Sequence, residues 1–384
     1  MERIKELTGL QEVSSLHPEH NSDLNRLTGA LAQAMSSQPD FLVSPLAVLT
    51  GLLMLEEGCS ANGAEIFKSL FLDDQDLLKD EMRSMLKSLS RGILKTTSHC
   101  TNALWLAEKT EIRKSYLKAV SRYFNAQLFT APGGQKRTVE AINRWLRLGS
   151  GLEMNEFDGV MLEAEDRGVL LNTFSYHGAW KARFNRKNTV MRPFHIDEDE
   201  YVNVMFMNEE AAMLHVANEQ CEGIVREFDD DSTVFVALKP KSGIAGLLES
   251  LNNDSLMELF DSAAIRTIEL LLPKLEIQKQ LDLGDFYAHC GLEELLDNVQ
   301  FDSIGEGVRV NKVVHRASLV LDESGGDDRQ QQEIFRRAVP HLRGPAMEMC
   351  FDSPFVFLIY DVSLKAVLLM GVVTDPGSAA LKKS

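Results

Sequence analysis

The sequence predicts an α+β fold, and the order of its periodic segments carries that prediction. Helical periodicity dominates residues 24–148, whereas strand-like patterns dominate from residue 169 onward, with one helical return. Helices first and strands later favour an α+β architecture over a wound parallel sheet. No repeat, low-complexity tract or Pro-, Gly- or Ser-rich linker marks a boundary, so we expect one domain over residues 1–384. Residues 1–23 and 377–384 are expected to be flexible ends.

The helical half begins with a predicted helix over residues 24–35, followed by a short strand that ends at Pro45. A second helix is expected over residues 45–57, because Pro45 suits a first helical turn and Ser44 can cap it. Apolar residues at helical spacing predict four further helices, at 64–71, 77–93, 112–124 and 139–148. A strand is expected at 103–107, between the second and the third of these helices.

The strand-rich half is predicted from alternating or continuous apolar runs. These runs indicate one helix, at residues 244–260, and the strands 169–176, 201–207, 212–216, 224–228 and 233–238. The last quarter holds an alternating strand at 313–321 and an apolar hairpin at 355–373. About thirty residues without periodicity separate these two features, and a loop of that length is usually functional or disordered.

Composition excludes several classes of partner. A formal net charge of −17 and a pI near 5.0 argue against general binding to nucleic acid or to an anionic membrane surface. The longest apolar stretch, residues 355–373, contains Asp361 and Lys365, so we expect no membrane span. The first residues lack the apolar region of a signal peptide. The protein is therefore expected to be cytoplasmic, or extracellular if a leader was removed.

Common enzyme motifs are missing from the sequence. It has no Gly-x-Ser-x-Gly elbow, no His-Glu-x-x-His pair and no Walker-type loop. The acidic runs 197–200 and 229–231 lack the spacing of an EF-hand and fit solvated turns. The five cysteines are widely spaced and form no metal pattern, so free thiols are expected. We expect no catalysis, no metal and no cofactor.

Four sequence blocks occur in an order that resembles the serpin family. They are Phe-Leu-Val-Ser-Pro from residue 41, Leu-Leu-Asn-Thr-Phe-Ser-Tyr-His-Gly-Ala-Trp from residue 170, Leu-Leu-Pro-Lys-Leu from residue 271, and the C-terminal strand and hairpin. The resemblance implies a large mainly antiparallel sheet, smaller sheets and about eight to nine helices. It also implies a monomer whose exposed reactive-centre loop is offered to serine proteases as bait.

The resemblance assigns roles to several polar residues. Ser44, Asn172 and His315 fall where the family places a buried hydrogen-bond cluster that controls opening of the main sheet. Trp180 and Lys274 match the top of that sheet, where Lys274 is expected to pair with Glu323 at the start of the loop. A second serine is common in the family where this chain has Ala47, so the buried network is expected to be thinner.

The start of the loop bears on whether the protein traps a protease. In inhibitory serpins the cleaved loop enters the main sheet as a new strand, which requires residues that tolerate burial. Gly325 and Gly326 provide a hinge, but Asp327 and Asp328 follow, and burying an unpaired carboxylate costs several kcal/mol. The sequence therefore favours a non-inhibitory or substrate-like serpin. The alternative is a functional suicide inhibitor.

The position of the scissile bond is predicted from two counts that disagree. Counting forward from Glu323 reaches the bond before Pro340, and counting back from Pro354 reaches Arg343 and Gly344. Proline disfavours cleavage on its N-terminal side, whereas a trypsin-like protease accepts arginine. We therefore predict Arg343 as the bait residue, in a loop longer than the inhibitory pattern.

A basic stripe recurs at every fourth residue of one predicted helix: Arg83, Lys87, Arg91 and Lys95. Some serpins bind heparin-like polyanions through a corresponding helix, so the stripe is a candidate polyanion site. The same spacing suits an ordinary solvated helix face.

Overall fold

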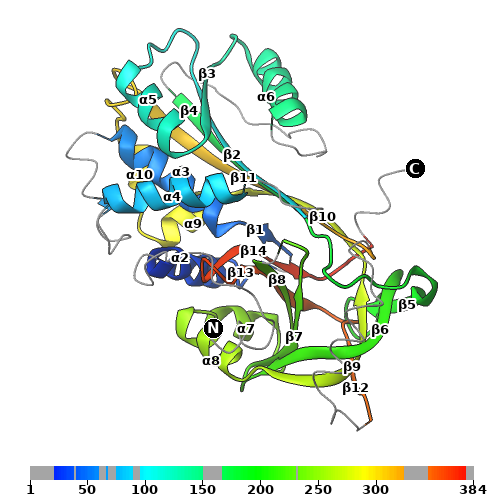
Figure 1. The fold of residues 1–384 in the computed structure, drawn as a ribbon. Helices are drawn as coiled ribbons and strands as arrows, with labels where there is room; N and C mark the ends of the chain where they lie inside the picture. The colour runs from blue at the N-terminus through cyan, green and yellow to red at the C-terminus, as the bar shows by residue number, and fades with distance from the viewer. Residues whose placement is uncertain are drawn as a thin grey trace.

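The computed structural model describes residues 21–38, 40–59, 66–67, 75–89, 96–149, 167–230, 232–323 and 345–377. Within these residues the fold is α+β, with nine α-helices and two sheets of nine and five strands (Figure 1). The helices are α2 (Asn21–Ala34), α3 (Pro45–Gly58), α4 (Gln75–Leu89), α5 (Lys114–Tyr123), α6 (Gln135–Gly149), α7 (Ile244–Ser250), α8 (Asn253–Asp261), α9 (Gly284–His289) and α10 (Glu294–Asp297), with a 3-10 turn η2 (Arg186–Asn188).

The five-stranded sheet has the order β10-β11-β4-β2-β3. Its strands are β2 (Thr97–Leu106), β3 (Ala126–Thr130), β4 (Arg167–His177), β10 (Leu275–Asp282) and β11 (Arg309–Leu321). β10 with β11 and β2 with β4 are antiparallel, whereas β2 with β3 is parallel. The central pair, β11 with β4, is also parallel and runs from Arg309 opposite Arg167 to Val320 opposite His177. We call this pairing the β4–β11 seam.

The nine-stranded sheet has the order β1-β14-β13-β8-β7-β6-β9-β12, with β5 paired to β6. Its strands are β1 (Leu42–Val43), β5 (Val190–His195), β6 (Tyr201–Ala217), β7 (Cys221–Glu227), β8 (Thr233–Pro240), β9 (Ala264–Pro273), β12 (Met347–Cys350), β13 (Phe355–Asp361) and β14 (Ala366–Val373). All its ladders are antiparallel except β12 with β9. The expected large, mainly antiparallel sheet is therefore present.

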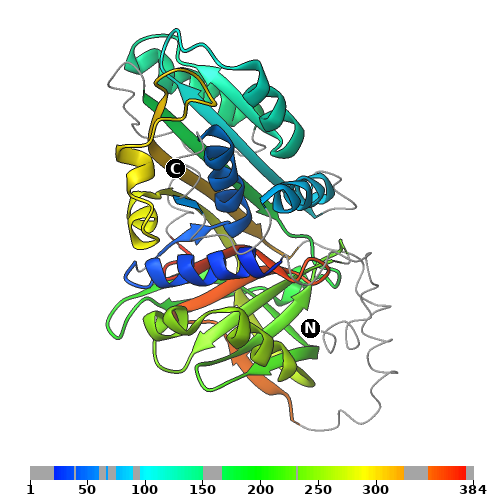
Figure 2. The same ribbon diagram turned by 90° about the vertical axis from the view of Figure 1, so that its left-hand side faces the viewer.

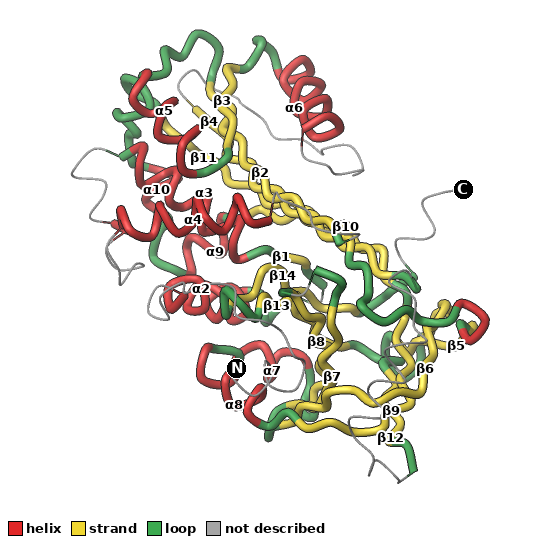
Figure 3. Tube along the Cα trace, viewed as in Figure 1, coloured by secondary structure: helices red, strands yellow, loops and turns green. Residues whose placement is uncertain are grey.

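Helix α3 lies in the core and contacts both β4 of the smaller sheet and β14 of the larger one. Every residue of α3 except Glu57 is buried, as expected for a helix that is apolar on all sides. Helix α6 covers the opposite face of the five-stranded sheet (Figure 3). There Ile142, Trp145 and Leu146 pack on side chains of β2, β4 and β11. The strands beside the seam are consequently buried on both faces along much of their length.

Two predicted elements differ from the observed ones for local reasons. The helix expected at 244–260 is two helices, because Asn252 leaves the helical conformation and caps α8 by accepting a hydrogen bond from the Ser255 backbone N–H. The two strands expected at 201–207 and 212–216 form one continuous strand, β6, whose middle pairs with β9. No helix in the described ranges has both the length and the apolar character needed to cross a membrane.

Candidate functional site: a buried polar row and the anchors of the loop

Polar side chains lie in one row across three strands of the five-stranded sheet. His315 on β11 is opposite Asn172 on β4, and Asn172 is opposite Asn102 on β2. All three are fully buried, and the Asn172 side-chain amide donates to Oδ1 of Asn102 at 2.5 Å. Asn102 was not singled out in the sequence, because its role depends on the register of two strands far apart in the chain.

Ser44 joins this row from the start of α3. Its backbone N–H donates to Nε2 of His315 at 3.1 Å, and its Oγ accepts from the Ala47 backbone N–H at 3.2 Å. Ser44 therefore caps the helix, as predicted, and at the same time attaches the helix to β11. The three residues expected to form a buried cluster are thus brought together, although their role in sheet opening remains a prediction.

His315 is uncharged in this setting. Burial lowers its pKa from the ordinary value of 6.5 to about 3, because charging an imidazole away from water is costly. Nε2 accepts the Ser44 hydrogen bond, so the neutral ring carries its proton on Nδ1. The cluster is therefore a neutral hydrogen-bonded joint between α3 and the seam.

Helix α3 approaches the polar row at Gly51. A Cβ atom at this position would collide with the side-chain amide of Asn172 and would lie 3.0 Å from a methyl carbon of Leu170. Glycine is needed at Gly51 because of this close approach of helix and sheet, and not because of its backbone conformation.

A second group of polar contacts lies where β11 ends and the loop begins. Oε2 of Glu323 is 3.0 Å from Nζ of Lys274, and its Oε1 accepts from the Thr189 hydroxyl at 2.8 Å. Nε1 of Trp180 donates to the Asp322 carbonyl at 2.7 Å. Burial by itself would raise the pKa of Glu323, but the hydrogen bonds from Lys274, its own backbone and Thr189 outweigh burial and lower the pKa. The ionised carboxylate therefore fixes the chain at the loop entrance.

A buried ion pair lies next to the ring of Trp180. Arg226 on β7 lies 2.7 Å from Glu209 on β6, and both side chains are 7% exposed. The Arg226 guanidinium also lies over the ring of Phe184 at 4.1 Å and over that of Trp180 at 5.4 Å. Sequence reasoning missed this pair, since only the strand order brings Glu209 and Arg226 together.

The predicted loop residues fall between the two anchored ends. Gly325, Gly326, Asp327, Asp328, Arg343 and Gly344 lie outside the described residues, as do Arg91 and Lys95 of the basic stripe. The described chain stops at Glu323 and resumes at Pro345, two residues before β12. β12 pairs in parallel with β9, from Met347 opposite Ile268 to Cys350 opposite Leu271.

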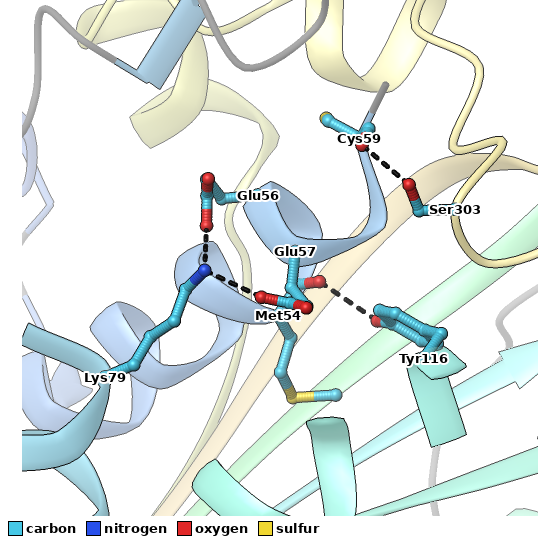
Figure 4. Close-up of polar contacts among 7 residues, drawn as sticks. All are labelled: Met54, Glu56, Glu57, Cys59, Lys79, Tyr116 and Ser303. Carbon is cyan, nitrogen blue, oxygen red and sulfur yellow. Dashed lines mark hydrogen bonds and ion pairs between the residues drawn. The ribbon is translucent and has the colours of Figure 1, made fainter. Parts of the chain in front are cut away.

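The described half of the basic stripe lies on α4, which is attached to α3 by its own ion pairs. Nζ of Lys79 lies 2.9 Å from Glu56 and 2.7 Å from Glu57 (Figure 4). Burial alone would lower the pKa of Lys79, but the two carboxylates raise it, so the ammonium stays charged. Further along α4, Arg83 is half-buried and Lys87 is exposed. The stripe is therefore not a uniformly solvated row.

The described residues contain no group of His, Cys, Asp and Glu side chains arranged to hold a metal ion. All five cysteines are free, as predicted, and Cys59 and Cys100 are buried enough for their thiol pKa values to rise to about 12. These thiols are consequently protonated and weakly reactive at neutral pH.

The sheet with a parallel central seam, the buried polar row at that seam and the fixed loop entrance are features of a serpin. A family model described as "Serpin (serine protease inhibitor)" matches residues 22–376. The chain belongs to the serpin family.

The curated relatives carry names of two kinds. Alpha-1-antiproteinase of Bos taurus is 25% identical over 355 residues, covering 90% of this chain and 84% of that protein. Corticosteroid-binding globulin of Oryctolagus cuniculus is 26% identical over 360 residues, covering 90% of this chain and 92% of that protein. The family thus includes proteins named for protease inhibition and proteins named for ligand binding.

Solved structures show the same fold. Native protease nexin-1 with heparin superposes with a TM-score of 0.82 at 17% identity, covering 93% of this chain and 98% of that one. Human thyroxine-binding globulin gives a TM-score of 0.82 at 18% identity, with the same coverage. At these identities the likeness concerns the fold.

Proposed function

We propose that residues 324–344 of this serpin are a bait loop for trypsin-like serine proteases, with Arg343 as the residue that such a protease recognises. The observation that carries this proposal is the anchoring of both ends of the segment. Glu323 is held by Lys274 and Thr189, and the chain re-enters the larger sheet at β12. A segment fixed at both ends by a rigid scaffold is a typical site of recognition. The family description, serine protease inhibitor, supports the same class of partner.

We infer further that trapping is weak or lost. A loop that entered the five-stranded sheet would become a strand between β4 and β11. One face of that position is lined by side chains no more than 2% exposed: Phe174, Tyr176, Ala317 and Leu319. Successive strand residues point to opposite faces, so either Asp327 or Asp328 would lie against this apolar surface. An unpaired carboxylate there would cost several kcal/mol, which opposes insertion.

Incubation with a catalytic amount of trypsin, followed by a denaturing gel, tests both statements. We expect cleavage in the loop, release of a C-terminal fragment and no covalent complex. Arg343→Ala should slow the first cut, whereas an equivalent change at the exposed Arg309, outside the loop, should leave it unchanged. A thermal scan of the cut protein should give nearly the same Tm as the intact protein.

The alternative function, a suicide inhibitor that uses Arg343 as bait, predicts the opposite result. A covalent complex with trypsin that survives denaturation, together with a large rise in Tm of the cleaved protein, would replace our proposal by this one. Resistance of the loop to every trypsin-like protease would exclude both functions.

A further inference from the structure

Positive charge is concentrated at one end of this acidic protein. Residues 107–147 contain nine Lys and Arg, three Glu and no Asp, which gives this segment a net charge of +6. The whole chain carries −17, so the remainder carries −23. The segment comprises α5, β3 and α6, which lie together at the top of the molecule in Figures 1 and 2. We call its basic side chains the basic lobe: Lys109, Arg113, Lys114, Lys118, Arg122, Lys136, Arg137, Arg144 and Arg147.

The cations of the basic lobe face solvent. All nine side chains are exposed, and between described residues none of them forms an ion pair. The charged side chains of α4 behave differently, because Lys79 is buried between two glutamates and the helix carries Asp76, Asp80 and Glu81 beside its three cations. Nine like charges at one end repel one another, and this repulsion is relieved when an anionic partner neutralises them.

The arrangement of the lobe favours a long ligand. On α5, Lys114, Lys118 and Arg122 are four residues apart, so they form a stripe about 12 Å long on one side of the helix. Helix α6 continues the positive charge on the opposite face of the sheet, beyond the edge strand β3. A small anion would meet only two or three of these cations, whereas a linear polymer can follow the stripe and wrap around the sheet edge.

The aromatic and apolar side chains around the basic lobe indicate which class of anionic polymer it could bind. Single-stranded nucleic acids are usually bound by stacking bases on exposed aromatic rings. Here the ring of Tyr123 lies under the guanidinium of Arg122 at 4.9 Å, and Phe129 is stacked on Trp105 at 4.4 Å. Among the described residues of the segment 107–147, Leu117 is the one large apolar side chain that is well exposed. A protein partner would need a more apolar centre to the interface.

We propose that the basic lobe, centred on α5, is a binding site for a linear sulfated polysaccharide. The site shares no residue with the anchors of the proposed bait loop, and its existence does not depend on the outcome of the protease experiments. It is also distinct from the predicted stripe of Arg83, Lys87, Arg91 and Lys95, because the two sets share no residue.

Heparin serves as the probe, and its affinity for the full chain is measured as a function of NaCl concentration. Lys114→Gln, Lys118→Gln and Arg122→Gln are combined in one variant. The matched control combines Arg183→Gln, Arg186→Gln and Lys187→Gln, which are three exposed cations outside the lobe. Both variants change the net charge equally, so a difference between them reports location and not total charge.

The α5 variant should bind heparin at least about tenfold more weakly at 50 mM salt, and its plot of log affinity against log salt should be less steep by about two to three units. The control variant, and a variant with Arg83→Gln and Lys87→Gln on α4, should remain within about threefold of the wild type. Equal losses in the α5 and control variants, or no binding of the wild type at 50 mM salt, would overturn the proposal. Tighter binding of a single-stranded DNA of the same charge would assign the lobe to nucleic acid instead.

Discussion

The polar row at the seam illustrates what single residues reveal in the sequence. Ser44, Asn172 and His315 were found because they stand in motifs that resemble a family, and Ser44 also because a serine before a proline is typical of a helix start. Asn102 and Gly51 carry no such signal. Asn102 matters because β2 pairs with β4 in one register, and Gly51 because α3 lies directly on Asn172. Both depend on tertiary packing that local patterns do not encode.

Gly51 and Gly246 provide a matched test of this packing. Both are helical glycines, but a Cβ at Gly246 would meet no atom within 4 Å, whereas one at Gly51 would collide with Asn172. Gly51→Ala should destabilise the protein by about 1–3 kcal/mol through overpacking. Gly246→Ala should be neutral or stabilise it by up to about 1 kcal/mol, because alanine is the better helix former. Urea unfolding of the two variants measures the difference, and equal stability would show that α3 can move away from the sheet.

At the scale of elements, long periodic helices were predicted well and short edge strands poorly. Helices α2, α3 and α5 agree with the expected ranges within a few residues. β3 and β5 were not predicted, because β3 is short and half-exposed and β5 is short and mostly exposed, so neither has a continuous apolar run. The two sheets themselves could not be predicted from local patterns, since β4 and β11 are adjacent in space but far apart in the chain.

The attachment of α4 to α3 yields a prediction about that pair of helices. Lys79→Met would leave the carboxylates of Glu56 and Glu57 facing each other without the cation, and these side chains are 8% and 30% exposed. Removing one partner of a buried ionic group typically costs about 3–5 kcal/mol, so the midpoint of urea unfolding should fall clearly.

The matched control is the triple variant Glu56→Gln, Glu57→Gln and Lys79→Met, which removes all three charges. It should recover most of the lost stability, because no uncompensated charge remains. A single Lys79→Met variant as stable as the wild type would mean that water reaches the two carboxylates and solvates them.

At the scale of the whole molecule, the two proposed functions differ in whether the loop can become part of the sheet. The paired strands β4 and β11, which would have to part, carry buried apolar side chains on one face, and the segment that would enter between them has Asp327 and Asp328 directly after its two glycines. Replacing Asp327, Asp328, Arg329, Gln330 and Gln331 by threonine and alanine removes the cost of burying charges and amides. We expect this variant to form a covalent complex with trypsin through Arg343 and to gain thermal stability after cleavage.

Adding Arg343→Ala to the variant with residues 327–331 replaced should abolish the covalent complex and leave the fold unchanged. If the variant with the replaced hinge is only cleaved, the failure to trap protease would be due to the length of the loop or to Ala47 in the buried cluster, and not to the polarity of the hinge. Complex formation by the wild type would show that the two aspartates are tolerated.

Deuterium uptake along β4 can report how firmly the closed sheet holds together before any protease arrives. Successive N–H groups of a strand point to opposite neighbours, so this one strand carries amides bonded towards β11 and amides bonded towards β2. The two sets lie on one strand between the same two layers of packed side chains. A difference between their exchange times measures how far the free energy of opening the β4–β11 ladder differs from that of opening the β2–β4 ladder. The strand thus contains its own reference, and the readiness of the sheet to open becomes a measurable quantity in the intact protein.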